Sequence, residues 1–199
     1  MNLIDKITAT FLIILLFPVW GVLFFLMEFF NKEPFVFKQR RMGKNKKIFT
    51  IYKIRTMGVD AEDRRKDLSD LNEAQLPAFK IKDDPRYTPL GRFLSQSSLD
   101  ESLQLINVLK GEMSLVGPRP LPVEEAKKTP GKYNLRFSVL PGITSSAVIK
   151  GNHWLSFHRW MESDLTDIKM KSFSRDWLIL FSTFLLVVTN TTKLLTGKK

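Results

Sequence analysis

Apolar residues form a nearly continuous run close to the start of the chain. No charged residue lies between Lys6 and Glu28, and residues 11–27 consist largely of Leu, Ile, Phe and Val. A run of this length approaches the roughly 20 residues that a membrane-spanning helix needs. A cleaved signal peptide is the alternative, but the sequence lacks a small-residue cleavage site after the run. We therefore interpret residues 1–33 as a membrane-embedded helix.

Pro18 lies in the middle of this run and predicts a kink, because proline removes a helical hydrogen bond and displaces the carbonyl four residues earlier. Seven Lys and Arg residues follow between positions 32 and 47, which places that side of the membrane in the cytoplasm. Both a single crossing and a re-entrant helix that returns to the same face satisfy this charge pattern. The residues alone favour the crossing, because irregular backbone is tolerated inside a bilayer only in special settings.

The pattern changes after Pro34, where shorter apolar runs alternate with charged turns. The runs 35–37 and 48–54 are rich in β-forming residues and flank a basic turn around Gly43, which predicts a β-hairpin near the membrane surface. The highly charged segment 60–75 has too few apolar positions for a buried face and is interpreted as a solvated helix or loop. Residues 34–199 are expected to form one compact, membrane-associated domain.

The clearest helical pattern begins at Ser98. Ser98 and Glu101 match a capping box, and apolar residues recur at helical spacing from Leu99 to Leu109 before Gly111. A strand-like run, 113–116, precedes a Gly-Pro-Arg-Pro loop at 117–120, whose prolines make it rigid. Further on, tryptophans among basic residues are typical of a membrane interface, while 177–192 is uncharged but rich in Ser, Thr and Asn, and makes a poor second crossing. The fold class expected is α+β, mostly helical, with interfacial amphipathic helices.

Composition narrows the partners without naming one. The 199 residues are 44% hydrophobic and carry a net charge of +11, so phospholipid, a phosphorylated substrate and nucleic acid are all candidates. The basic cluster 38–47 directly follows a membrane segment, where anionic lipid is a simpler explanation than nucleic acid, and no nucleic-acid partner is expected. Cysteine is absent from the sequence, which excludes thiolate metal sites. His153 and His158 miss the i, i+4 spacing of a shared metal site and are interpreted as interfacial or structural.

Asp100 and Glu101 are the strongest candidates for chemistry. Acids in a first helical turn are common for electrostatic reasons alone. The same position keeps a carboxylate ionised for attack on phosphorus, while its neighbour can hold Mg²⁺. Arg119, between two prolines, suits phosphate binding in a fixed geometry, although a solvent-facing arginine is an equal alternative. Three further cations could bind phosphate or lipid headgroups, namely Lys53, Arg55 and Arg86.

Several of these motifs occur together, in order, in a known family. They are the Pro-broken N-terminal helix, PFVFKQRRMG at 34–43, FTIYKIRTM at 49–57, DPRYT at 84–88, SLDE at 98–101 and GEMSLVGPRP at 111–120. The chain strongly resembles the monotopic, or small, phosphoglycosyl transferases of bacterial sugar transferases over nearly its whole length. The last two motifs together are highly specific.

The resemblance implies transfer of a sugar phosphate from a UDP-sugar to undecaprenyl phosphate, with Mg²⁺ required, as the first membrane step of glycan assembly. It implies that Asp100 is the nucleophile of a covalent phosphosugar intermediate and that Glu101 is a Mg²⁺ ligand or positioning group. It also implies a re-entrant N-terminal helix kinked at Pro18 and a catalytic domain on the cytoplasmic face of the bacterial inner membrane. Membrane phospholipid and a second copy of the chain, as a homodimer, are the other expected partners.

The sequence departs from the family pattern in three regions. Ser95 replaces a common arginine, Ser102-Leu103 replaces the usual Leu-Pro after the Asp-Glu pair, and Val148 and Asn152 fall within an altered run after Pro141-Gly142. These changes bear on nucleotide or sugar specificity more than on the covalent step, because Asp100, Glu101 and Arg119 are present. A catalytically degenerate relative that acts as a membrane scaffold for glycan enzymes is the alternative to an active transferase.

Overall fold

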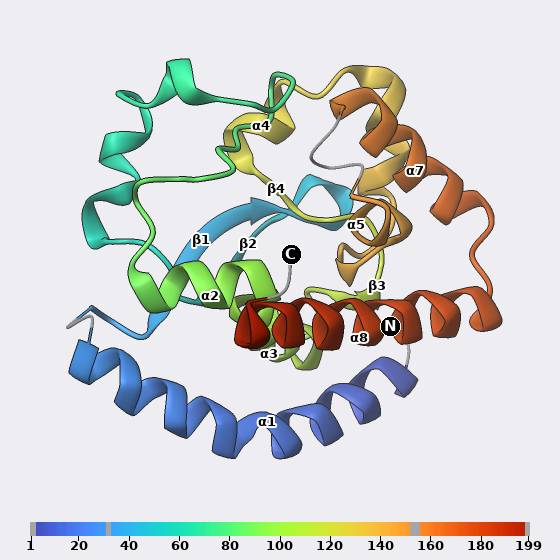
Figure 1. Cartoon of the computed structure of the whole chain (residues 1–199). Helices are drawn as coiled ribbons and strands as arrows, with labels where there is room; N and C mark the ends of the chain where they lie inside the picture. The colour runs from blue at the N-terminus through green and yellow to red at the C-terminus, as the bar shows by residue number, and fades with distance from the viewer. Residues whose placement is uncertain (1–2, 31–32, 152–155, 198–199) are drawn as a thin grey trace.

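A computed structural model describes residues 3–30, 33–151 and 156–197 (Figure 1). The helices are α1 (Leu3–Phe30), α2 (Pro89–Ser97), α3 (Leu105–Leu109), α4 (Val123–Lys127), α5 (Ser146–Ile149), α7 (Phe157–Lys169) and α8 (Phe173–Thr196). The strands are β1 (Val36–Met42), β2 (Ile48–Ile54), β3 (Ser114–Val116), β4 (Leu121–Pro122) and β5 (Gly142–Thr144). Helices dominate, as the sequence predicted.

The predicted hairpin is confirmed as β1 and β2, which pair antiparallel with Gln39 opposite Ile51. β4 joins the free edge of β1, where Met42 lies opposite Leu121, so the sheet has the order β2-β1-β4. The predicted strand at 113–116 is also confirmed, as β3, and it pairs in parallel with β5. Two small sheets therefore form the centre of the domain.

The N-terminal helix α1 lies along the base of the domain and bends near its middle, with Pro18 inside the helix (Figure 1). Near its start, Asp5 accepts a hydrogen bond of 2.5 Å from Ser114 in β3. Past the proline, the indole N–H of Trp20 donates to the Ser102 hydroxyl at 2.9 Å. Both halves of α1 therefore contact the globular part of the chain.

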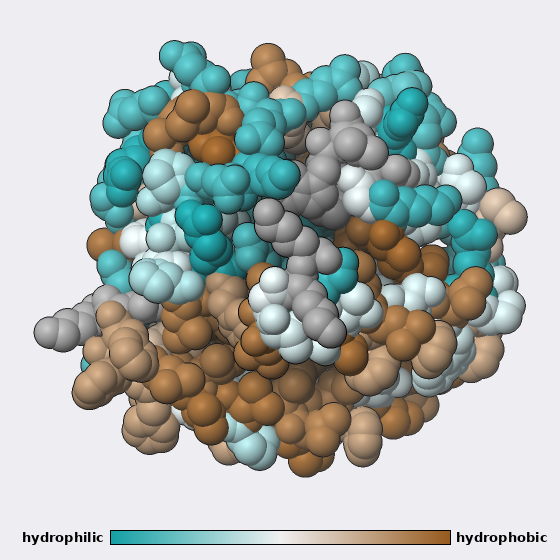
Figure 2. Space-filling view, in the orientation of Figure 1, coloured by the Kyte–Doolittle hydropathy of each residue, from teal (hydrophilic) through white to brown (hydrophobic). Residues whose placement is uncertain are grey.

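Apolar side chains cover the face on which α1 and α8 lie, whereas the opposite end of the molecule is hydrophilic (Figure 2). Exposed phenylalanines such as Phe17, Phe25, Phe181 and Phe184 lie on these two helices. By length and hydropathy, both helices qualify as candidate membrane helices. The segment that was expected to make a poor second crossing, α8, therefore passes this test of length and hydropathy. It nevertheless packs against α2, α5, β3 and β5.

The capping box predicted at Ser98 is wrong. Ser98 has a left-handed backbone, with φ of 64°, and it ends α2; its side chain makes no cap hydrogen bond. A capped helix does occur, but it is α2, which lies before Ser98 and begins at Pro89. There the Thr88 hydroxyl accepts a hydrogen bond from the Gly91 N–H at 3.0 Å. Glycine is required at position 91, because a Cβ there would lie 1.9 Å from the Thr56 carbonyl oxygen.

Candidate active site

Asp100 and Glu101 lie in a 3-10 turn, Leu99–Gln104, that packs against β2. Leu103 and Gln104 are buried and anchor the turn in the domain. Lys53 extends from β2 to both acids, with its Nζ 2.7 Å from Glu101 Oε1 and 3.7 Å from Asp100 Oδ2. The β2 strand thus positions the Lys53 ammonium group beside both acids.

Arg119 forms two charge-assisted hydrogen bonds with Glu101. Its Nη1 donates to Oε2 at 2.9 Å and its Nη2 donates to Oε1 at 2.5 Å. This bidentate geometry is the strong form of an arginine–carboxylate pair. Both oxygens of Glu101 are consequently occupied by Arg119 and Lys53, whereas Lys53 is the one ion-pair partner of Asp100 within the described part of the chain.

The stiffness of the Arg119 loop comes from more than its prolines. Arg41 donates to the Pro120 carbonyl at 2.9 Å, and Arg136 donates to the Arg119 carbonyl at 2.8 Å. Arg136 in turn pairs with Asp164 of α7, which is fully buried. Two arginines far apart in sequence therefore hold the backbone on which the Arg119 side chain is mounted.

The environment drives the two acidic pKa values apart. Burial raises the pKa of Asp100 to about 6; Lys53 opposes this rise and the charge of Glu101 adds to it. Burial also acts to raise the pKa of Glu101, but Arg119 and Lys53 outweigh it and hold that pKa well below its usual range. Opposite shifts in neighbouring carboxyls are a feature of functional sites.

The physical reason predicted for an ionised Asp100 is therefore wrong. The residue does not sit in the first turn of a capped α-helix, and burial opposes its charge rather than favouring it. It is nevertheless mostly ionised at pH 7, because its pKa of about 6 lies below that pH.

The other predicted phosphate ligands are only partly brought to this site. Arg86 lines the same cavity as the acid pair, but its guanidinium is held by Asp84, with Nη2 2.6 Å from Oδ2. Arg55 lies apart: its Nε donates to the Pro34 carbonyl at 2.9 Å, and its guanidinium stacks on Phe37.

Residues from each region that departs from the family pattern line the cavity, namely Ser95, Ser102 and Val148. The Ser95 hydroxyl lies 2.8 Å from the Tyr87 hydroxyl, and Val148 lines the wall. Asn152 and His153 lie outside the described residues. His158, in α7, forms a hydrogen bond with the buried Tyr133, which agrees with a structural role.

Sequence reasoning missed three basic residues. Arg41 and Arg136 support the Arg119 loop, and Lys80 lines the cavity next to the acid pair. Arg41 was visible only as one charge of a basic cluster, and Lys80 as one of several lysines near a turn. Their places depend on contacts between distant segments, which local patterns do not report.

A cavity of about 1230 Å³ joins the acid pair to the apolar base. Its polar part is lined by Lys53, Lys80, Asp100, Glu101 and Arg119. Its apolar part lies between α1 and α8, where the lining residues are Leu12, Leu15, Leu16, Leu180, Phe181, Phe184 and Val187. A ligand with an anionic head and an apolar tail matches this division.

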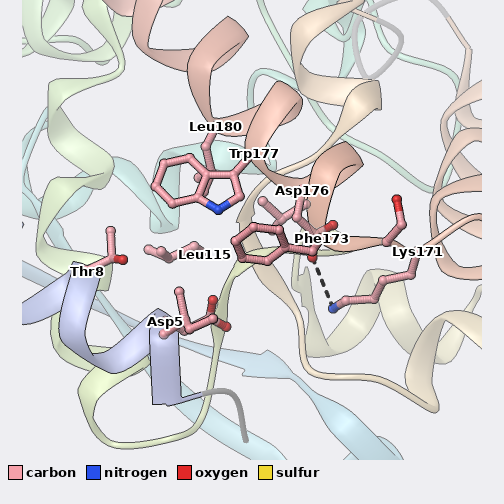
Figure 3. Close-up of a pocket in the computed structure, with 11 residues that line it drawn as sticks. Asp5, Thr8, Leu115, Lys171, Phe173, Asp176, Trp177 and Leu180 are labelled. Carbon is pink, nitrogen blue, oxygen red and sulfur yellow. Dashed lines mark ion pairs between the residues drawn. The ribbon is translucent and has the colours of Figure 1, made fainter.

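A smaller cavity of about 190 Å³ lies where α1 and α8 begin (Figure 3). Phe173 and Trp177 of α8 face Asp5 and Thr8 of α1 across it, with Leu115 between them. Asp176 pairs with Lys171 at 3.9 Å on the rim. The cavity shows how the two apolar helices meet at one end, beside β3.

The sequence matches the family model described as bacterial sugar transferase over residues 1–190. The chain therefore belongs to the bacterial sugar transferase family, which confirms the resemblance carried by its motifs.

Named relatives agree with this membership. The chain is 40% identical over 173 residues to galactosyl transferase CpsE of Streptococcus agalactiae, a match that covers 85% of this chain and 38% of the relative. It is 36% identical over 150 residues to the UDP-glucose:undecaprenyl-phosphate glucose-1-phosphate transferase of Escherichia coli, covering 74% and 30%. It is 34% identical over 154 residues to the undecaprenyl-phosphate galactose phosphotransferase of Salmonella typhimurium, covering 75% and 32%. The chain thus spans only 30% to 38% of the length of these three relatives.

Proposed function

We propose that this chain transfers a sugar phosphate from a UDP-sugar to undecaprenyl phosphate at the cytoplasmic face of the bacterial inner membrane. The observation that carries the proposal is the single cavity that places a charged acid pair at one end and an apolar trough between α1 and α8 at the other. A polyprenyl phosphate has the same division, with an anionic head on a long hydrocarbon chain. The names of the relatives describe reactions of this class.

Asp100 is the proposed nucleophile. Both oxygens of Glu101 are occupied by Arg119 and Lys53, whereas Asp100 has the longer contact, at 3.7 Å from Lys53. A carboxylate oxygen of Asp100 attacks the phosphorus that bears the sugar, and the bond to the second phosphate breaks, which releases UMP. An oxygen of the lipid phosphate then attacks the same phosphorus, and Asp100 leaves as a carboxylate. Neither step needs a net proton.

Lys53 and Arg119 orient the reacting phosphate in this scheme. Their positive charges are fixed by Glu101 and by the clamped Arg119 loop, so little reorganisation is needed as negative charge develops. Glu101 then acts by holding these two cations in place. This role follows from its contacts and is compatible with the metal role expected of it.

Mg²⁺ is the proposed cofactor, and the residues present fit it. Magnesium commonly takes one or two protein carboxylates and completes its oxygen shell with water and phosphate. Asp100 and Glu101 are adjacent, and the described residues contain no group of three acidic or imidazole side chains that would hold a metal alone. When bound, the ion would neutralise charge on the diphosphate. Asp100 would hold it together with Glu101, which has about one of its four lone-pair sites left once Lys53 and Arg119 occupy the others.

A re-entrant α1 is the proposed membrane arrangement. A straight helix of this length would span about 42 Å, enough to separate its ends across a bilayer. Instead Asp5 and Trp20 both contact the catalytic domain, and Met27 is buried against it. A single cysteine at Lys6 tests this, because the chain has no native cysteine. It should resist an impermeant thiol reagent in intact cells and react after lysis; a Lys82→Cys control should behave alike, and labelling of position 6 in intact cells would contradict the proposal.

Turnover tests the reaction itself. Purified protein in detergent or nanodiscs should release many equivalents of UMP from a suitable UDP-sugar only when undecaprenyl phosphate is added; without the lipid it should release at most one equivalent per protein. Chelation of Mg²⁺ should stop the release. Glycan-assembly relatives that lost catalysis would bind membranes without releasing UMP. Failure with a full panel of UDP-sugars would therefore support the scaffold alternative.

A further inference from the structure

Lys80 lines the cavity of the acid pair, and it lies in a segment for which the sequence pattern predicts no helix, strand or functional residue. Its side chain lines the same cavity as Asp100 and Glu101. The segment 72–80 is a loop that contributes Ala78 to the core, and the residue after Lys80, Ile81, is buried. A lysine carried into a catalytic cavity by a loop needs an explanation.

The loop holds the backbone of Lys80 at both of its polar atoms. Its N–H donates to the Asn72 side-chain oxygen at 2.8 Å, and its carbonyl accepts from the Glu73 N–H at 2.8 Å. The Asn72 amide also donates to the Ala74 and Ala78 carbonyls, at 3.0 and 3.2 Å. These bonds fix where the Lys80 side chain starts, in contrast to a lysine on a frayed surface loop.

The charges around Lys80 favour an anion in the cavity. Seven basic and five acidic side chains line it, a surplus of positive charge. The charged groups that act on Lys80 are Arg119, Glu101, Lys53 and Glu125; burial first, and then the charge of Arg119, lowers its pKa to about 6. A bound phosphate would compensate both the burial and the repulsion from Arg119.

We propose that Lys80 is a further phosphate-binding residue, which holds the diphosphate of the nucleotide sugar together with Lys53 and Arg119. This inference rests on the proposed function for the identity of the donor. Lys80 would contribute only to binding of the donor. Glu101 has a different role, because it holds Lys53 and Arg119 in place beside the phosphate that reacts. Lys80 forms and breaks no covalent bond in this role.

Affinity for UDP, measured by calorimetry on the full chain in nanodiscs, tests the assignment. Lys80→Met should weaken UDP binding about tenfold or more, the scale of a lost hydrogen bond to a charged group. Lys80→Arg should retain much of the affinity. Lys82→Met is the matched control, because Lys82 is exposed two residues away, and it should bind UDP as the wild type does. A folded Lys80→Met that binds UDP with wild-type affinity would overturn the proposal.

A second measurement on the wild-type protein serves if Lys80→Met does not fold. Brief acetylation followed by peptide mass spectrometry should show that UDP protects Lys80 and that uridine, which lacks phosphate, does not. Equal acetylation of Lys80 with and without saturating UDP would refute the assignment. A wild-type protein that binds UDP through Lys80 but releases no UMP would instead refute the proposed function and leave Lys80 as a phosphate ligand.

Discussion

Replacing Arg136 by methionine tests a buried ion pair and a support of the Arg119 loop together. The side chains of Arg136 and Asp164 are 2% and 0% exposed, and they meet at 2.8 Å. Arg136 also donates to the Arg119 carbonyl at 2.8 Å. The substitution removes the partner of a buried acid and one support of the active-site loop at once.

The expected cost can be worked out from these contacts. Burial raises the pKa of Asp164 to about 6 even though Arg136 opposes that rise. At pH 7 the ionised form of Asp164 is thus favoured over the neutral form by only about 1 kcal/mol, which is lost when the acid takes a proton instead. The Arg119 carbonyl left without its donor adds about 1–3 kcal/mol. The total of about 3 kcal/mol lies at the low end for a broken buried pair.

The pH dependence has a definite sign. Without Arg136, the pKa of Asp164 rises further above its ordinary value of 3.8. A folded carboxyl with a raised pKa stabilises the protein below the unfolded pKa, and this stability is lost as the pH rises through the folded pKa. The difference in the free energy of unfolding between variant and wild type should therefore be about 1 kcal/mol smaller at pH 5 than at pH 7. At pH 5 Asp164 is largely neutral in both proteins.

Urea unfolding of both proteins in the same detergent, at pH 5 and pH 7, provides the measurement. A double variant, Arg136→Met with Asp164→Leu, should recover part of the lost stability, because it leaves no buried carboxyl. It should still turn over more slowly than the wild type, since the Arg119 carbonyl lacks its donor. A deficit of Arg136→Met that is equal at both pH values would refute the reasoning.

Two further tests concern the contacts that support the catalytic turn. Gly91→Ala should prevent stable folding, seen as a lost melting transition, because its Cβ would lie 1.9 Å from the Thr56 carbonyl; Gly131→Ala, whose nearest neighbour is 3.7 Å away, should melt like the wild type. Trp20→Phe and Ser102→Ala each remove the bond between α1 and the turn, and each should lower kcat up to about fivefold with the donor KM unchanged. Fully additive losses in the double variant would contradict a shared contact.

Local patterns predicted the elements whose partners are close in sequence. The β-rich runs on either side of Gly43 became β1 and β2, and the run before the Gly-Pro-Arg-Pro loop became β3. Pro18 does lie within the long apolar helix. In each of these cases the residues that determine the structure are neighbours along the chain, so their periodicity carries the information.

The active-site turn shows where such reasoning fails. Ser98 and Glu101 have capping-box spacing, but Glu101 instead pairs with Lys53 and Arg119, which are 48 and 18 residues away. Two charge-assisted contacts outweigh one local cap, whose contribution is about 1 kcal/mol. The start of α2 does carry a local signal, because Thr88 is a favourable N-cap residue and Pro89 follows at the first helical position.

The central claim is that Asp100 carries a covalent phosphosugar, and intact-protein mass spectrometry tests it most directly. Wild-type protein incubated with candidate UDP-sugars and Mg²⁺, without lipid acceptor, should gain the mass of one phosphosugar. Glu101→Gln should still be labelled to some extent, because the attacking carboxylate remains. Asp100→Asn should gain no mass, since it keeps the shape of the side chain but lacks the nucleophile. A phosphosugar adduct on Asp100→Asn would contradict the account.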